Sequence, residues 1–458
     1  MMDLKDLLLT PIYLIMIYAI AYASRNKFTT PKTKKYFIPA LTVKIFGAIA
    51  LGLVYQFYYH GGDTFRFFIE SEKIYNPLLD SPKIGIKLLL ATGEFDPETY
   101  QYASTMRWYT AQNNQLIVKA CAFFSLFCFR TYAVIAIIFA SICFTGVWAL
   151  YTTLLKIFPK YYNQLAVGVF FVPSAFFWAS GIMKDTVCLA MLGWAFWAFY
   201  QGFVEKKNIL LSILVLSLAL FIIKVVKIYI LLCFVPAAGL WIFMENSKRI
   251  KSKALRLIAT PLLIAIGLVG GYFGSTYLTS DDDKYSVDNI AETAAVTSDY
   301  LDRRTDKIAG TGRRTGSSYN VGKLDGSTAS MIAAAPQAIF VSLYRPFLFE
   351  VRNPVMLLSA LESTWFLWIT LMMIRKKGLT KIIQLITKTP LLTFCLVFSL
   401  MFALGVGLTS GNFGTLVRYK TPMLPFFVSM LLLLRAYSKI PKSKNSGRVL
   451  ASKYQVRG

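Results

Sequence analysis

Asp63 is an acidic residue that directly follows an uninterrupted apolar stretch of the chain. Residues 57–68 read FYYHGGDTFRFF, so two glycines precede the carboxylate, and His60, the only histidine of the protein, stands three residues before it. The glycines allow the backbone to turn sharply. A carboxylate at the boundary of a membrane helix is costly in free energy and is therefore a candidate for function. Asp63 is our first candidate catalytic residue.

Four other polar motifs flank apolar segments, and their charged residues are mostly basic. They are residues 180–185 (SGIMKD), Lys224 with Lys227, residues 345–353 (RPFLFEVRN) and residues 411–420 (GNFGTLVRYK). Arginine binds a phosphate with two parallel hydrogen bonds, and lysine binds it as a point charge. The set predicts a shared anion site whose phosphate-binding residues are Lys184, Arg345, Arg418 and Lys420. Each cation taken singly is equally well interpreted as a contact to lipid headgroups or to internal carboxylates.

Acidic and neutral polar residues of the same motifs complete the predicted site. Asp185 is the second candidate catalytic residue, although a role as N-cap of the helix that follows is an equal alternative. We predict that His60, Glu350 and Asn412 bind substrate. A single histidine excludes a multi-histidine metal site, and we assign no metal ligand. Asp63, His60, Asp185 and Glu350 nevertheless have the donor atoms for one hard cation such as Mg²⁺ or Mn²⁺.

The apolar content of the chain indicates an all-α polytopic membrane protein. Hydrophobic residues make up 56% of the 458 residues and charged residues only 16%, which excludes a soluble enzyme. Apolar runs of about 17–25 residues recur, and each is long enough as a helix to cross the hydrocarbon of a bilayer. They predict about eleven membrane helices: 7–24, 36–58, 131–153, 163–180, 184–201, 208–224, 228–244, 257–277, 354–374, 389–408 and 422–437.

The net charge of +26 encodes membrane orientation and does not indicate a nucleic-acid partner. Lysine and arginine cluster in short connections near residues 25–35, 206–207, 248–256 and 375–381 and in the tail. Short basic loops stay on the cytoplasmic side of a membrane. This rule predicts an N-out, C-in protein with its polar motifs outside, in contact with anionic membrane lipid. We expect a bacterial inner membrane, with the active face outward; the oligomeric state is left open.

Six segments follow from this organisation, and two of them are large outer loops. The segments are the first two membrane helices (1–58), an outer loop with juxtamembrane helices (59–130), a membrane bundle (131–277), a flexible outer loop with a membrane-proximal segment (278–353), the C-terminal membrane helices (354–437) and a basic cytoplasmic tail (438–458). Within the first loop, residues 116–129 are apolar but too short for a comfortable span, so we interpret them as interfacial or re-entrant. Their neighbours resemble amphipathic helices on the membrane plane.

The combination of a first-loop acid, juxtamembrane helices and later polar turns resembles the GT-C glycosyltransferases. These integral membrane enzymes take sugars from polyprenyl-phosphate carriers. Asp63 matches the acid of the family's first outer loop, and residues 173–185 (PSAFFWASGIMKD) and 418–425 (RYKTPMLP) are similar to short patches of such enzymes. The chain departs from the pattern because its acid follows the second helix, is not paired with another acid, and no soluble C-terminal domain is evident.

The resemblance implies an inverting glycosyltransferase of cell-envelope polysaccharide or glycoconjugate synthesis. Asp63 is then the general base that deprotonates an acceptor hydroxyl, and the acceptor is a glycan, a lipid or a protein. Arg345, Arg418 and Lys184 stabilise the departing polyprenyl phosphate. Asp185 either holds Lys184 or orients sugar hydroxyls.

Three other functions fit the same sequence. An O-antigen-polymerase-like or ligase-like enzyme depends more on Arg418 and Arg345 than on Asp63. A transporter of a lipid-linked sugar places charges along a path through the membrane and often contains inverted repeats. A non-catalytic subunit of an envelope complex tolerates replacement of the outer polar residues.

Overall fold

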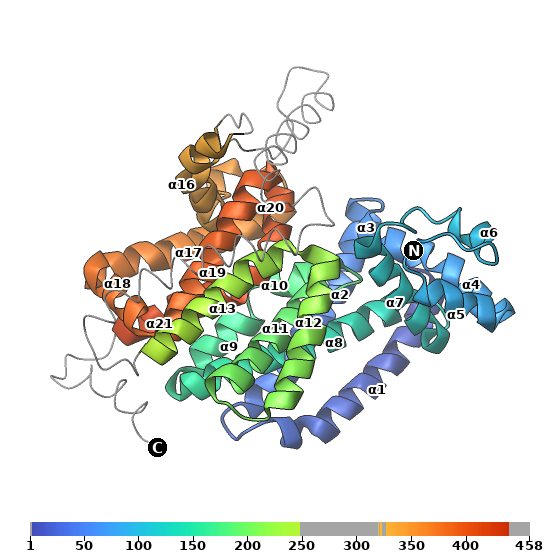
Figure 1. The fold of residues 1–458 in the computed structure, drawn as a ribbon, viewed down its shortest axis with the longest axis horizontal. Helices are drawn as coiled ribbons and strands as arrows, with labels where there is room; N and C mark the ends of the chain where they lie inside the picture. The colour runs from blue at the N-terminus through green and yellow to red at the C-terminus, as the bar shows by residue number, and fades with distance from the viewer. Residues whose placement is uncertain (1, 248–318, 320, 323–326, 439–458) are drawn as a thin grey trace.

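Long apolar segments fold as helices because, without water, each backbone N–H and C=O must be bonded within its own segment. The computed structural model describes residues 2–247, 319, 321–322 and 327–438, and within these residues the regular structure is helical, with no strand (Figure 1). Eight of the described helices are long and apolar enough to span a membrane, and a ninth span results if one bent pair is counted. The chain is therefore a polytopic helical membrane protein.

The eight candidate spans follow the predicted apolar segments closely. They are α1 (Leu4–Phe28), α2 (Lys34–Leu53) continued by the π-helix η1 (Val54–Tyr58), α8 (Tyr132–Ile157), α11 (Lys184–Phe199) continued by the π-helix η3 (Tyr200–Val204), α12 (Ile209–Lys227), α13 (Tyr229–Ser247), α17 (Pro354–Lys377) and α19 (Pro390–Ser410). The bent pair begins with α20 (Phe413–Tyr419). Its second part is the 3₁₀ turn η5 (Thr421–Met423) together with α21 (Leu424–Ser438), and the axes of the two parts differ by 41°. The predicted span 257–277 lies outside the described residues.

The predicted span 163–180 is wrong. This segment forms two short helices, α9 (Tyr162–Phe170) and α10 (Pro173–Trp178). The break occurs at Val172, whose backbone is extended (φ −80°, ψ 116°), because a residue before proline is disfavoured in the helical region. Hydropathy alone did not reveal the break, since both halves are apolar.

Short helices between α2 and α8 form the first non-spanning part of the chain. They are α3 (Asp63–Glu70), α4 (Glu72–Asp80), α5 (Pro82–Leu90), α6 (Tyr100–Ala103) and α7 (Gln112–Cys128). Their buried apolar side chains, such as Phe65, Ile74 and Ile117, form a core of their own with the beginning of α8. The segment predicted as too short to span is the helix α7, which is not among the candidate spans.

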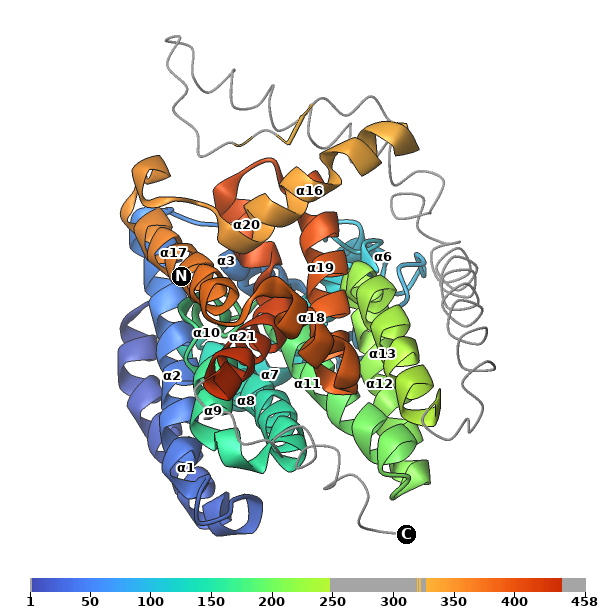
Figure 2. The same ribbon diagram turned by 90° about the vertical axis from the view of Figure 1, so that its left-hand side faces the viewer.

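The helices α8 and α11 pack against each other, with α1 and α2 against α8 and α12 against α11. Figure 2 shows α1 and α2 on one side of the molecule and α12 and α13 on the other, with α18 (Leu379–Lys388) and α21 between them and α17 toward the side of α2. The helix α16 (Thr328–Tyr344) crosses near one end of the bundle, and the 3₁₀ turn η4 (Leu348–Glu350) connects it to α17. The remaining 3₁₀ turn, η2 (Pro159–Tyr161), precedes α9.

Two glycines allow α8 and α11 to approach each other closely. A Cβ atom at Gly146 would lie 2.0 Å from the carbonyl oxygen of Ala190, and one at Gly193 would lie 2.1 Å from the carbonyl oxygen of Gly146. Small residues at such contacts are typical of helix pairs in membranes, where close packing of the backbones drives association. The central pair of the bundle therefore depends on the absence of side chains at these positions.

We predict that Gly146→Leu destabilises the protein by about 3 kcal/mol, since the added side chain forces the two helices apart. Gly239→Leu is the matched control, because no atom lies within 4 Å of a Cβ at this helical position on α13. Thermal unfolding of the purified protein in detergent measures both variants. Equal melting temperatures for Gly146→Leu and the wild type would contradict the close contact.

Candidate functional site

A turn of unusual backbone conformation positions Asp63. The π-helical end of α2 is followed by His60, Gly61 and Gly62, with φ values of +53°, +133° and +136°. Gly62 also packs against the ring of Tyr55, and a Cβ atom there would lie 2.4 Å from that ring. Glycine is therefore required at position 62 for both its conformation and its space. Asp63 follows as the first residue of α3.

Buried contacts hold α3 in place next to α8. The hydroxyl groups of Thr64 and Tyr132 form a hydrogen bond of 2.7 Å, and both side chains are buried. The ring of Phe65 lies 4.4 Å from that of Tyr132, measured between centroids. Because the neighbour of Asp63 is fixed in this way, the carboxylate has a defined position at the end of the helices.

Arg418 binds both candidate catalytic carboxylates. Its Nη1 donates to Oδ2 of Asp63 at 2.8 Å, and its Nε donates to Oδ2 of Asp185 at 2.9 Å. The side chain of Asp185 is fully buried, that of Arg418 is 16% exposed, and that of Asp63 is 42% exposed. The arginine thus joins a buried acid to an acid that solvent and a substrate can reach.

Lys227 completes the neutralisation of Asp185. Its ammonium donates to Oδ1 of Asp185 at 2.5 Å and lies 4.6 Å from the ring centre of Tyr419. Asp63, Asp185, Lys227 and Arg418, which we call the charge cluster, come from α3, α11, α12 and α20. Two carboxylates balance two cations, as the low-dielectric interior of a membrane protein requires.

Lys184 adds an uncompensated positive charge beside the cluster. It begins α11, its side chain is half-buried, and it lies within electrostatic range of Lys227, Arg418 and Asp185. Among the residues that the structure describes, no carboxylate or carbonyl binds its ammonium. The Nη2 group of Arg418 likewise has no hydrogen-bond acceptor in the described chain. Both donors are therefore without a protein acceptor in the described structure.

Asp185 does not hold Lys184 and does not cap α11. Met183 is the N-cap residue of that helix, and it makes no side-chain capping bond. Asp185 uses its oxygens for Lys227 and Arg418 instead. Both sequence-based interpretations of this residue as a local partner are therefore wrong, because its partners come from distant parts of the chain.

Arg345 and Glu350 bind each other near the cluster. The Nε of Arg345 donates to Oε2 of Glu350 at 3.0 Å, its Nη2 bonds Oε1, and the N–H of Phe347 donates to the same carboxylate at 2.8 Å. The guanidinium lies 5.1 Å from the ring centre of Phe413 in α20. The pair closes the turn between α16 and α17, so each residue already has a structural partner.

Lys420 lies apart from the charge cluster. Its side chain is only 1% exposed, and its ammonium donates to the carbonyl of Ser342 at 3.1 Å and to Oγ of Ser363 at 3.4 Å. The residue therefore links α16 to α17. The structure does not bring it to the anion site that was predicted to include it.

His60 and Asn412 are the other predicted substrate-binding residues. His60 is exposed in the turn before Asp63. Asn412 caps α20, because its side-chain oxygen accepts the N–H of Gly414 at 2.7 Å. Their roles toward a substrate remain predictions.

The predicted ligands of a Mg²⁺ or Mn²⁺ ion do not form a group. Within the described ranges, no three histidine, cysteine or acidic side chains are placed to hold a metal ion. Asp63 and Asp185 face cations, and Glu350 faces Arg345. The carboxylates are thus neutralised by protein side chains.

Glu362 is a buried carboxylate that the sequence analysis missed. It lies in α17 with 5% exposure, and its Oε2 accepts the N–H of Ser174 at 2.8 Å, at the beginning of α10. Its Oε1 has no hydrogen-bond partner in the described structure. An isolated acid inside an apolar predicted span was the available signal, since charged residues within membrane segments are costly and mark functional positions.

Comparisons with models of known protein families, with curated proteins and with solved structures found no match. Fold and site together define a polytopic helical membrane protein with a charge cluster at one end of its helices. Its activity must be argued from that geometry, and the resemblance to GT-C glycosyltransferases stays a hypothesis.

We predict that Asp185→Asn lowers the stability of the protein by about 3–5 kcal/mol, because the buried Lys227 loses its counter-ion and the partly buried Arg418 loses one of its two. The double variant Asp185→Asn/Lys227→Met should lose less than the sum of the two single variants, since it removes one of those cations. Thermal unfolding in detergent measures this coupling. Asp80→Asn, at an exposed position on α4, is the control, and strict additivity of the pair would contradict the observed contact.

We also predict that acid weakens the turn between α16 and α17. Burial works against the ionised form of Glu350, but the Arg345 guanidinium and the Phe347 N–H outweigh it and hold the pKa of Glu350 below its ordinary value of 4.5. A carboxyl group whose pKa is lower in the folded than in the unfolded state stabilises the fold at pH values above its unfolded pKa. This stabilisation disappears as the pH falls below about 4.5. Wild type should therefore lose more thermal stability than Glu350→Gln between pH 6 and pH 4. Parallel loss in both proteins would contradict this role.

Proposed function

We propose that this protein is a membrane glycosyltransferase that moves a sugar from a polyprenyl-phosphate carrier to a glycan, lipid or protein acceptor. The observation that supports the proposal is the geometry around Arg418. A partly exposed carboxylate, Asp63, binds Nη1 of Arg418, whose Nη2 has no acceptor among the described residues. Lys184, whose ammonium also has no acceptor there, lies within electrostatic range of Arg418 and Asp185. A base beside an anion site is what this reaction requires.

The active face is the non-cytoplasmic one in this proposal. The beginning of α1 lies beside the beginning of α8, where Lys5 donates to the carbonyl of Phe129 and Asp6 accepts the N–H of Ala133. Asp63 follows the end of α2 at the same end of the bundle. The basic residues of 25–35 and 206–207 lie at the opposite ends of these helices. The positive-inside rule supports an N-out, C-in orientation, and we propose a bacterial inner membrane as the location.

The reaction proceeds by a single displacement. Asp63 removes the proton of the acceptor hydroxyl through Oδ1, the oxygen that Arg418 does not bind. The hydroxyl oxygen attacks the anomeric carbon of the donor sugar, a new C–O bond forms, and the bond from that carbon to the phosphate oxygen breaks. The polyprenyl phosphate leaves with the bonding electron pair, and Lys184 with Nη2 of Arg418 stabilises its negative charge. The anomeric centre is inverted.

Asp185 and Lys227 act in this proposal through Arg418. Asp185 is fully buried and binds Nε of the guanidinium. Lys227 neutralises the other oxygen of the same acid. They are positioning residues, because they fix the direction in which Arg418 presents its remaining donors.

Replacement of Asp63 by asparagine tests the proposal. We predict that Asp63→Asn reduces glycosyl transfer by a factor of about 10² to 10⁴, the usual contribution of a general base. Lys184→Gln should mainly raise KM for the lipid-linked donor. The measurement uses the full chain in proteoliposomes with a panel of polyprenyl-phosphate sugars and acceptors, and a monodisperse elution profile shows that each variant is folded.

Asp80→Asn is the matched control, since this aspartate is exposed and lies outside the site. Full activity of Asp63→Asn would exclude Asp63 as the base. Transfer that survives in all variants of the charge cluster would exclude the whole site.

A transporter of an anionic lipid-linked sugar is the second candidate, and buried charges within the spans favour it. Lys44 in α2 and Glu362 in α17 are buried. Such residues line translocation paths in many transporters. Two results together would favour a transporter over the enzyme. The protein would move the lipid-linked sugar across proteoliposome membranes, with Glu362→Gln abolishing this movement, and it would transfer no sugar to any acceptor.

A further inference from the structure

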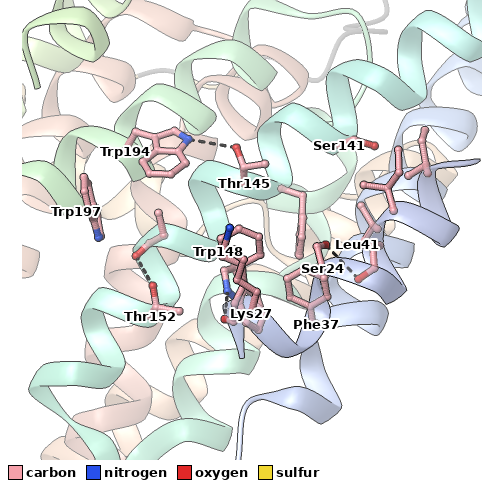
Figure 3. Close-up of a pocket in the computed structure, with 16 residues that line it drawn as sticks. Ser24, Lys27, Phe37, Leu41, Ser141, Thr145, Trp148, Thr152, Trp194 and Trp197 are labelled. Atoms are coloured by element: carbon pink, nitrogen blue, oxygen red, sulfur yellow. Dashed lines mark hydrogen bonds between the residues drawn. The ribbon is translucent and has the colours of Figure 1, made fainter. Parts of the chain in front are cut away.

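A cavity of about 700 Å³ lies between α1, α2, α8 and α11, far along the helices from the charge cluster (Figure 3). Lys27 and Phe28, at the last turn of α1, line it, whereas Asp63 lies at the end where α1 begins. Its volume is in the range typical of small-molecule sites. It is therefore a second, separate place at which a ligand fits.

The hydrogen bonds between α1 and α8 lie near the two ends of α1, whereas Tyr18, in the middle of α1, bonds Oγ1 of Thr42 in α2 at 2.8 Å. Near the beginning of α1, Oδ1 of Asp6 accepts the N–H of Ala133 at 2.6 Å. At its end, the carbonyl of Phe28 accepts the indole N–H of Trp148 at 3.1 Å. Small side chains line the space between α1 and α8, among them Ala21 and Ala149.

The hydroxyl groups in the cavity wall are already bonded to their own helices. Ser24, Ser141, Thr145 and Thr152 each donate to a backbone carbonyl three or four residues earlier, and Oγ1 of Thr145 also accepts the indole N–H of Trp194. Figure 3 shows the bond between Trp194 and Thr145. With their hydrogens engaged, these groups offer little to a polar ligand. The cavity therefore suits a hydrocarbon chain.

Positive charge surrounds the end of the cavity at which Lys27 lies. The side chain of Lys27 is exposed at the last turn of α1. The segment 25–35 contains five basic residues, and the sequence has no acidic residue between Asp6 and Asp63. An anionic headgroup is the complement of this surface, since each basic residue near a membrane surface attracts acidic lipid.

We propose that the cavity binds one acyl chain of a single anionic phospholipid whose phosphate lies at Lys27. The chain fills the apolar space beside Trp148, Trp194 and Trp197, and the headgroup remains in the leaflet at the basic end of the helices. This bound lipid fills the space that α1, α2, α8 and α11 leave between them. The site is independent of glycosyl transfer, because no residue of the charge cluster lines it.

Tryptophan fluorescence tests the proposal directly. The full-length protein in non-ionic detergent is titrated with phosphatidylglycerol brominated on its acyl chains, since bromine quenches nearby indoles. We expect saturable quenching at lower concentrations than with brominated phosphatidylcholine. Trp197→Phe should reduce the quenching amplitude, whereas Trp368→Phe, an exposed tryptophan on α17, should leave the saturable part unchanged.

Two further variants separate the chain from the headgroup. Ser141→Phe fills the cavity and should abolish saturable quenching, while Gly239→Phe, at an open position on α13, should not. Lys27→Gln should raise the half-saturating concentration of the anionic lipid about fivefold, and Lys388→Gln on α18 should leave it unchanged.

Each of the following results would overturn the proposal. Quenching without saturation, saturable quenching that survives in Ser141→Phe, or an unchanged quenching amplitude in Trp197→Phe would show that no chain enters the cavity. Equal affinities for the two headgroups, or an unchanged affinity in Lys27→Gln, would show that the site does not select an anionic lipid.

Discussion

The interaction on which the polar end of this protein depends is the double ion pair of Arg418. One guanidinium binds Asp63 and Asp185, which are 355 and 233 positions away in the chain. An isolated charge in the interior of a membrane protein costs several kcal/mol, so these groups are stable there only together. The cluster consequently fixes the relative positions of α3, α11, α12 and α20, and a candidate base and candidate anion ligands meet as a result.

Interruptions of the helices bring polar groups into the bundle. The chain breaks before Pro173, and Lys44 donates to the carbonyls of Ala175 and Ala179 beside that break. It bends again at Lys420, between α20 and η5. Irregular backbone at membrane depth must find partners within the protein, and the buried lysines supply them. The second bend also places Arg418 near the interior, where it reaches Asp185.

The two ends of the bundle differ in chemistry. At the Asp63 end, the charge cluster consists of ion pairs and lies beside Lys184, which has no carboxylate partner among the described residues and which binds the donor phosphate in our proposal. At the other end, an apolar cavity next to Lys27 is suited to a lipid that stays. Neutralised charges at one end and unneutralised basic loops at the other give the protein a defined orientation in the membrane, as we propose.

Local sequence determined most of the long helices and all of the polar motifs. Hydropathy over a window of some twenty residues reflects the burial of one helix in hydrocarbon, and this needs no knowledge of the neighbours. The polar motifs that flank the apolar segments contain all four residues of the charge cluster. Hydropathy failed at residues 163–180, where a proline decides the backbone within an apolar run.

Only the tertiary structure decided which charges are partners. Asp185 pairs with Lys227 and Arg418 and not with adjacent Lys184, Lys420 turns toward Ser342 and Ser363, and Glu362 emerges as a buried acid. Coulomb interactions depend on distances between helices that are remote in sequence, and desolvation depends on what covers each group. The sequence therefore determined which residues are unusual, and the packing of the helices determined which of them can act together.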